Sequence, residues 1–216
     1  MKELFKKSSW FLVPWFFFLI VGAIIIALEP HGDLHIKLNK FHNAFGNFLF
    51  YYITFLGDGI TATIVVVMLL AVKYKDAILV GLCVLVSSAV TQLLKHTLFS
   101  DYVRPKKFFE GVYQLNFVQG IDNYSYYSFP SGHTTVAFSL YFSLAVLVKN
   151  NNLKFLFFII ALSAGFSRIY LSQHFFEDVY AGSCIGVSCS FFICYFLNKS
   201  KRISSSMWME KSLTGK

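Results

Sequence analysis

The sequence has 216 residues, of which 56% are hydrophobic, 19% aromatic and only 14% charged. A soluble domain has about a quarter of its residues charged, so this composition indicates a membrane protein and excludes a separate large soluble domain. The formal net charge of +8 comes from short basic clusters between apolar runs, with no continuous basic stripe. This pattern argues against nucleic acid as a partner.

The apolar runs predict an all-α, polytopic membrane protein built as a bundle of six transmembrane helices. A helix needs about 20 apolar residues to cross a bilayer, so six helices leave little chain for anything else. We therefore expect a single membrane-embedded domain over residues 1–216, with its core at about 57–197 and a basic tail at 198–216. The expected spans are Trp10–Leu28, Ile60–Val72, Ala77–Leu98, Pro130–Val148, Phe155–Leu171 and Val179–Leu197.

The segment Glu29–Asp58, between the first two spans, is polar at first and aromatic from Phe45 to Phe55. Aromatic rings concentrate at the headgroup level of membranes, so we predict an interfacial segment here. The run Ile60–Val72 is short for a crossing, and the aromatic stretch can instead be half of a longer span. Asp58 is well placed to cap the helix that follows it.

Six crossings place both chain ends on the same side of the membrane. Short lysine clusters at the start of the chain, at 73 and 75, at 149 and 154, and in the tail then share that side. Cytoplasmic loops carry an excess of lysine and arginine, so we expect cytoplasmic termini in a bacterial-type inner membrane. The loops at 29–58, 99–129 and 172–178 face the outside.

Three polar clusters lie at the outward ends of the predicted spans. Ionisable groups at such places are costly and usually functional. Basic side chains beside a helix N-terminus form an anion site, because the terminus presents free amide groups and the positive end of the helix dipole. Pro130 is expected at the first helical position of its span. The clusters are Lys95 with Arg104 and Pro105; Pro130, Ser131, Gly132 and His133; and Ser167, Arg168, His174 and Asp178.

The spacing of His174 and Asp178 indicates a nucleophile with its own carboxylate. Residues four apart on a helix are neighbours, so the carboxylate can fix the imidazole tautomer and stabilise the charge that forms on attack. His133, on another segment, can serve as the acid. We expect phosphate as the anion, with no metal and no other cofactor. A single such histidine is usually only an interfacial residue; the convergence of three clusters favours a catalytic site.

These clusters resemble the three-part signature of the type 2 phosphatidic acid phosphatase superfamily, whose fold is shared with vanadium haloperoxidases and bacterial acid phosphatases. The resemblance implies that His174 becomes a phosphohistidine, that Asp178 orients it, and that His133 protonates the leaving oxygen and later activates water. The family usually has six residues between its lysine and Arg-Pro, whereas this chain has eight, so the loop must bulge for Lys95 to take its role. The implied holders of the phosphate oxygens are Lys95, Arg104, Ser131, the Gly132 amide and Arg168.

We therefore expect an integral-membrane enzyme that removes phosphate from a lipid phosphate monoester or diphosphate at the outer face of the membrane. Lipid A, undecaprenyl diphosphate, phosphatidylglycerol phosphate and phosphatidic acid all remain candidate substrates. A lipid phosphotransferase that uses the same phosphohistidine, or a non-catalytic transporter or scaffold, is the alternative. The oligomeric state stays open, because Gly182 and Gly186 form a small-residue pattern that serves packing inside the bundle or a dimer face.

Overall fold

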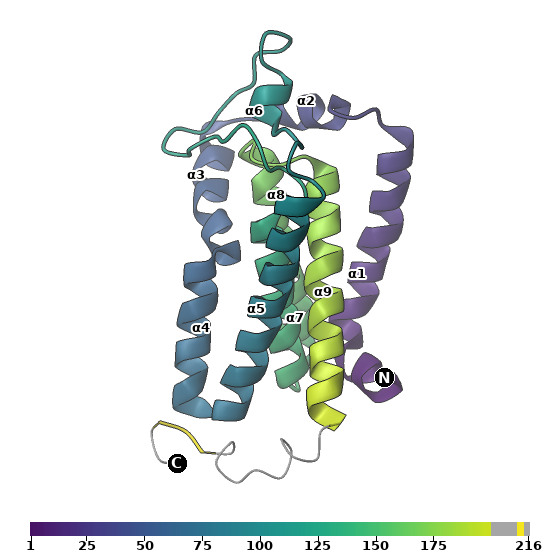
Figure 1. Ribbon diagram of the computed structural model, residues 1–216, viewed down its shortest axis with the longest axis vertical. Helices are drawn as coiled ribbons and strands as arrows, with labels where there is room; N and C mark the ends of the chain where they lie inside the picture. Colours follow the sequence, from purple (N-terminus) through teal and green to yellow (C-terminus); the bar gives the residue numbers. More distant parts are fainter. Residues whose placement is uncertain (200–210, 214–216) are drawn as a thin grey trace.

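The computed structural model describes residues 1–199 and 211–213, and every regular element in this part of the chain is a helix (Figure 1). Four helices are long and apolar enough to cross a membrane: α1 (Lys2–Leu28), α5 (Tyr74–Thr97), α8 (Asn151–Tyr170) and α9 (Phe176–Lys199). The shorter elements are α2 (Asp33–Asn39), α3 (Ala44–Ile53), the 3₁₀ helix η1 (Thr54–Gly57), α4 (Gly59–Val72), α6 (Pro105–Phe108) and α7 (Gly132–Leu147).

The second half of the segment Glu29–Asp58 fits the alternative expectation, half of a longer span. Its aromatic part forms α3 and η1, which run on into α4 after a bend of 52°, so that together they are long and apolar enough for one broken span. Each half has its own cap, because Asn43 accepts from the Gly46 amide and Asp58 accepts from the Ile60 amide. The aromatic rings of this stretch therefore lie on a helix that leads into α4.

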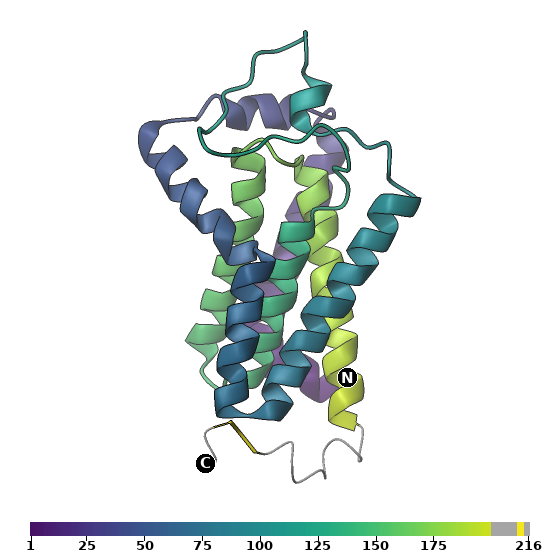
Figure 2. The ribbon, with the colours of Figure 1, turned by 60° about the vertical axis from the view of Figure 1, so that its left-hand side comes forward.

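Helix α7 lies at the centre of the bundle, between α5, α8 and α9 (Figures 1 and 2). It has 16 residues, which is about 24 Å of helix and shorter than an isolated span requires. Phe138, Leu140, Phe142 and Ala145 on it are fully buried. A helix that is apolar on all sides belongs in the interior, and α7 has that position. With the broken span counted once, the described residues hold five segments long and apolar enough to cross, and the six that we expected from the sequence would require α7 as well.

Two glycines bring the start of α9 into contact with the start of α7. A Cβ atom on Gly182 would lie 2.7 Å from the Ser131 carbonyl oxygen, and one on Gly186 would lie 2.6 Å from that of Thr135. Such distances allow no side chain, so these glycines serve packing inside the bundle and not a dimer face. The contact joins the segment that carries His133 to the helix that carries Asp178.

The chain ends and the polar clusters lie at opposite ends of the bundle. The N-terminus and the end of α9 at Lys199 are at one end, while α2, α6 and the long loop 98–131 cover the other (Figure 1). This arrangement agrees with an even number of crossings. Apart from residues 198, 199 and 211–213, the predicted basic tail lies outside the described residues.

Candidate active site

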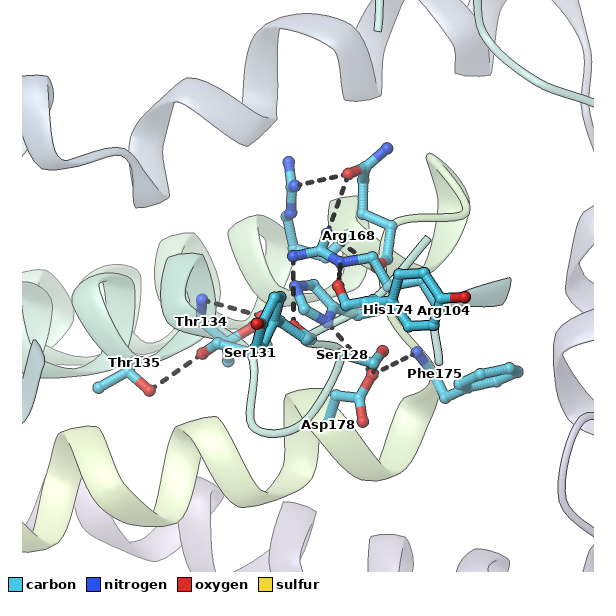
Figure 3. A network of polar contacts seen from close by, with 12 residues as sticks. Arg104, Ser128, Ser131, Thr134, Thr135, Arg168, His174, Phe175 and Asp178 are labelled. Carbon is cyan, nitrogen blue, oxygen red and sulfur yellow. Dashed lines mark hydrogen bonds and ion pairs between the residues drawn. The ribbon is translucent and has the colours of Figure 1, made fainter. Parts of the chain in front are cut away.

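The three polar clusters meet at the end of the bundle that α2 and α6 cover (Figure 3). The backbone amide of Ser131 donates to the Asp178 carbonyl at 3.0 Å, which joins the second cluster to the third. The side chain of Arg104 donates to the side chain of Gln173 at 3.2 Å, which joins the first cluster to the third. The convergence that we predicted from the topology is therefore present in the fold.

His174 and Asp178 form a buried pair. The Nδ1 atom of His174 lies 3.1 Å from Oδ2 of Asp178, and only 2% of His174 is exposed. The same Oδ2 accepts from the Phe175 amide at 2.9 Å and from the Ser128 hydroxyl at 2.5 Å. Asp178 is in the first turn of α9, whereas His174 precedes the helix, so the expectation that both lie on one helical turn is wrong.

This geometry determines which nitrogen of His174 can react. With Nδ1 directed at the carboxylate, its proton is held there and Nε2 keeps a free electron pair. The pKa of His174 lies well below its ordinary value, chiefly because the ring is buried, and next because Arg104, Lys95 and Arg168 oppose a further positive charge. A histidine with a lowered pKa stays neutral at neutral pH and gains a proton only in acid. The ring is therefore in the form that a nucleophile requires.

Two arginines converge on one amide oxygen. Arg104 and Arg168 both donate to Oε1 of Gln173, at 3.2 and 3.4 Å. Arg168 also donates to the Thr54 hydroxyl at 2.6 Å, and Arg104 donates through Nε to the Tyr126 carbonyl at 2.9 Å. Within the described structure the buried Nε of Arg168 has no acceptor. A buried donor without an acceptor is rare and fits a site made for an anion.

Lys95 lies with these cations despite the longer spacing before Arg104. It is 6% exposed in the last turn of α5, and its ammonium group is close enough to interact electrostatically with Arg104, Arg168 and Asp178. The two additional residues form turns after the helix, where the amides of Phe99 and Tyr102 bond back along the chain. The longer loop therefore still returns Arg104 to the site.

The second cluster supplies the start of α7. Gly132 is the first residue of the helix, and Ser131 is its N-cap, accepting from the Thr134 amide at 3.4 Å. Pro130 therefore precedes the cap, and its predicted place as the first helical residue is wrong, because the Ser131 side chain already supplies the cap. His133 follows in the first turn, and its Nε2 atom lies 3.5 Å from Oδ2 of Asp58.

Three residues of the site escaped the sequence analysis. Thr54 was placed in the predicted interfacial segment, far from any motif. Ser128 precedes the second motif by two positions, and Gln173 lies in the five-residue gap inside the third. Each is a neutral polar residue whose importance comes from an ionised partner, so residue type alone gave no signal. The adjacency of Gln173 to His174 and of Ser128 to the second motif was the available clue.

The helix α2 is buried against the loop that carries His174. The pattern of His31, Asp33 and His35 around Gly32 is typical of an exposed interfacial turn. His35 nevertheless is 3% exposed, and its Nε2 atom lies 3.2 Å from the Ser172 hydroxyl. Burial, followed by the nearby His42 and His31, lowers the pKa of His35 to about 4. Among residues 1–199 and 211–213, no group of three or more His, Cys, Asp or Glu side chains is placed to hold a metal ion.

Thr54→Val is expected to weaken anion binding, because it removes the hydroxyl that accepts from Arg168 at 2.6 Å. A hydrogen bond to a charged group contributes about 1.5–3 kcal/mol, so the Kd of orthovanadate, measured by calorimetry on the purified protein, should rise roughly ten- to a hundredfold. Thr54→Ser keeps the hydroxyl and should bind normally. Thr97→Val is the matched control, since the Thr97 hydroxyl bonds only within its own helix. Unchanged affinity in Thr54→Val would contradict this role.

Comparison with known proteins places this site in a family. Residues 76–202 match the PAP2 superfamily. Over 87 residues the chain is 34% identical to phosphatidylglycerophosphatase B of Bacillus subtilis, a match that covers 36% of this chain and 43% of that protein. The alignment thus spans less than half the length of this curated relative.

Two solved structures share the fold. The crystal structure of Aquifex aeolicus LpxE has a TM-score of 0.67 and 23% identity, over 76% of this chain and 93% of that one. The transmembrane PAP2-type phosphatidylglycerolphosphate phosphatase from Bacillus subtilis has a TM-score of 0.62 and 26% identity, over 92% of this chain and 98% of that one. The second likeness includes nearly all of both chains.

Proposed function

Because the chain belongs to the PAP2 superfamily, a family that includes membrane lipid phosphatases, we propose that it hydrolyses a lipid phosphate through a phosphohistidine on His174. The observation that carries the proposal is the buried pair of His174 and Asp178 beside Lys95, Arg104 and Arg168. A protein that only binds or carries a lipid phosphate needs the cations. It has no need for a neutral imidazole held by its own carboxylate, so this pair favours an enzyme over a transporter or scaffold.

The reaction proceeds in two displacements. Nε2 of His174 attacks phosphorus while the bond to the leaving oxygen breaks, and the leaving oxygen takes a proton from His133. The proton remains bonded to Nδ1 and is held by a hydrogen bond to Asp178. This carboxylate stabilises the positive charge on the ring. Water then attacks the phosphohistidine and gives a proton to His133, the P–N bond breaks, and phosphate leaves. Both histidines thereby return to their starting protonation states.

The basic residues stabilise the negative charge of the transferring phosphoryl group. Phosphoryl transfer depends mainly on positioning and on electrostatic stabilisation of the equatorial oxygens. Lys95, Arg104, Arg168, the Ser131 side chain and the Gly132 amide are placed to supply both. Three cationic side chains perform the task that a magnesium ion has in many phosphoryl-transfer enzymes, so we propose a reaction without a metal.

The substrate is proposed to be phosphatidylglycerol phosphate. Phosphatidic acid, undecaprenyl diphosphate and lipid A phosphates are the alternative substrates. Two similar proteins, the curated relative and one of the solved structures, are named as phosphatases of this lipid. For the orientation we propose cytoplasmic termini and a site that faces outward in a bacterial inner membrane. The lysine clusters at 73 and 75 and at 149 and 154 flank helix ends away from the site, as the positive-inside rule requires.

Purified protein in mixed micelles is expected to release inorganic phosphate fastest from phosphatidylglycerol phosphate when the four lipids are compared at equal surface concentration. EDTA should leave the rate unchanged, because side chains hold the phosphate. His174→Ala serves as the blank. If no lipid releases phosphate above this blank, or if EDTA stops turnover and magnesium restores it, the proposal fails. An excess of glycerol tests transfer: phosphorylated glycerol in place of free phosphate would identify a phosphotransferase.

A further inference from the structure

The break between α3 and α4 contacts the active site at three points. The Thr54 hydroxyl accepts from Arg168. Gly57 lies so close to α7 that a Cβ atom on it would be 2.9 Å from the His133 carbonyl oxygen. Asp58 places Oδ2 at 3.5 Å from Nε2 of His133. The Tyr141 hydroxyl of α7 fastens the same turn by donating to the Leu56 carbonyl at 3.1 Å.

The carboxylate of Asp58 is held in place at the start of α4. Its Oδ1 atom accepts from the Ile60 amide at 2.7 Å, which leaves Oδ2 for His133. The N-terminus of a helix favours a negative charge, so this cap position suits a carboxylate. Because Gly57 has no side chain, the turn can lie directly against the backbone of His133 and bring the carboxylate within reach of its ring.

His133 needs such a partner because of its surroundings. A general acid must carry a proton. The partial burial of this ring, and next Arg168, Arg104 and Lys95, oppose a positive charge on it, whereas Asp58 favours that charge. The side chains of His133 and Asp58 are 34% and 30% exposed, against 2% and 4% for His174 and Asp178. The first pair is thus open to a leaving group and to water, and the second is enclosed.

We propose that Asp58 is the positioning residue of the general acid, so that the site contains two histidine–aspartate pairs, one for the nucleophile and one for the acid. This inference rests on the proposed phosphohistidine reaction. Asp58 accepts the Nε2 proton of His133 and directs the opposite nitrogen, Nδ1, to the substrate. Nδ1 donates its proton to the leaving oxygen as the P–O bond breaks, and the neutral ring later takes a proton from the attacking water.

The test compares two leaving groups. An alkoxide leaves poorly and needs its proton, whereas nitrophenolate leaves well without one. We measure kcat/KM, which reports the steps up to formation of the phosphoenzyme, for decyl phosphate and for p-nitrophenyl phosphate. Asp58→Asn keeps a cap for α4 but removes the charge. This variant should lower kcat/KM for decyl phosphate roughly ten- to a hundredfold, which is part of the 10²- to 10⁴-fold contribution of a general acid. For p-nitrophenyl phosphate the loss should be less than about threefold.

His133→Ala defines the largest selective loss that the acid can cause. Equal losses on both substrates in Asp58→Asn, or no loss, would overturn the proposal for Asp58 if His133→Ala remains selective. If His133→Ala also lacks selectivity, the acid assignment of His133 fails, and this proposal with it. Phosphate release by His174→Ala at the wild-type rate would locate the failure in the proposed function itself.

Two further variants separate positioning from folding. Asp58→Ser can also cap α4 and has no charge, so it should repeat the selective loss if Asp58→Asn does not fold. Asp101→Asn removes an exposed carboxylate from the loop after α5, where its contact is the neighbouring Ser100, and should leave both kcat/KM values unchanged. Thermal unfolding in detergent shows whether each variant keeps its structure. A merely structural role for Asp58 would reduce both activities together.

Discussion

His174→Ala should abolish turnover, with a loss of at least about 10⁴-fold, because no other group can form the covalent intermediate in its place. Labelled lipid, quenched during turnover, should leave acid-labile phosphate on the wild-type protein and none on the variant. His133→Ala should still acquire label, but it should gain and lose label more slowly, since departure of the leaving group needs its acid and hydrolysis needs its base. These two variants therefore assign different roles to the two histidines.

His96→Ala is the matched control for this experiment. His96 is exposed in the last turn of α5, one residue after Lys95, and its ring contacts Tyr127. Its removal should change neither the rate nor the amount of label. Normal turnover in His174→Ala, or equal labelling of the wild type and His174→Ala, would remove the phosphohistidine from the mechanism.

Gln173→Glu should weaken phosphate and vanadate binding by at least about a hundredfold, judged from two or more hydrogen bonds to charged groups. The two guanidinium groups that would hold the phosphate oxygens already meet on Oε1 of Gln173, which is 1% exposed. Its amide is fixed with that oxygen toward the arginines, because Nε2 donates to the Asp122 carbonyl and to the Asn123 side chain. A carboxylate here would pair with both arginines and repel a phosphate dianion.

A neutral variant separates charge from positioning at the same place. Gln173→Met removes the shared acceptor without adding charge, so it should weaken inhibition by vanadate less than Gln173→Glu does. Gln114→Glu adds the same charge to an exposed position in the loop after α6 and should leave inhibition unchanged. Equal inhibition constants for the wild type and Gln173→Glu would show that the amide does not organise the arginines.

The sequence predicted the parts of this molecule that depend on local chemistry. Apolar runs located the long helices of the described chain, and the order of the spans predicted that His133, Arg168, His174 and Asp178 lie at one end of the bundle. The break at Thr54–Gly57 could not be predicted in this way. An aromatic stretch is compatible both with a headgroup layer and with a helix interior, and only its packing against α7 decides between them.

The remaining errors have the same origin. His35 is a polar residue in a glycine-containing loop, a pattern typical of an exposed turn, yet α2 buries it against Ser172. Gln173 and Ser128 carry no charge and belong to no metal or nucleophile pattern. Their roles follow from hydrogen bonds to charged partners. Arg104 and Asp178 are 50 or more residues away in the sequence from Gln173 and Ser128, respectively, and Arg168 lies across a turn from Gln173. Such roles depend on tertiary contacts that local spacing does not contain.

The central position of α7 separates this helix from the bilayer. A helix in contact with lipid responds to a mismatch between its apolar length and the bilayer thickness by tilting or by deforming the lipid around it. Helix α7, which carries His133, is enclosed by its neighbours. The bundle therefore shields it from the effects of such a mismatch. Bilayers of different thickness would act first on the outer helices α1 and α4, whose apolar side chains are largely exposed. Helix α7 is thus kept from direct contact with the lipid, and an effect of lipid composition on the site would come through the turn at residues 54–58, at the start of α4.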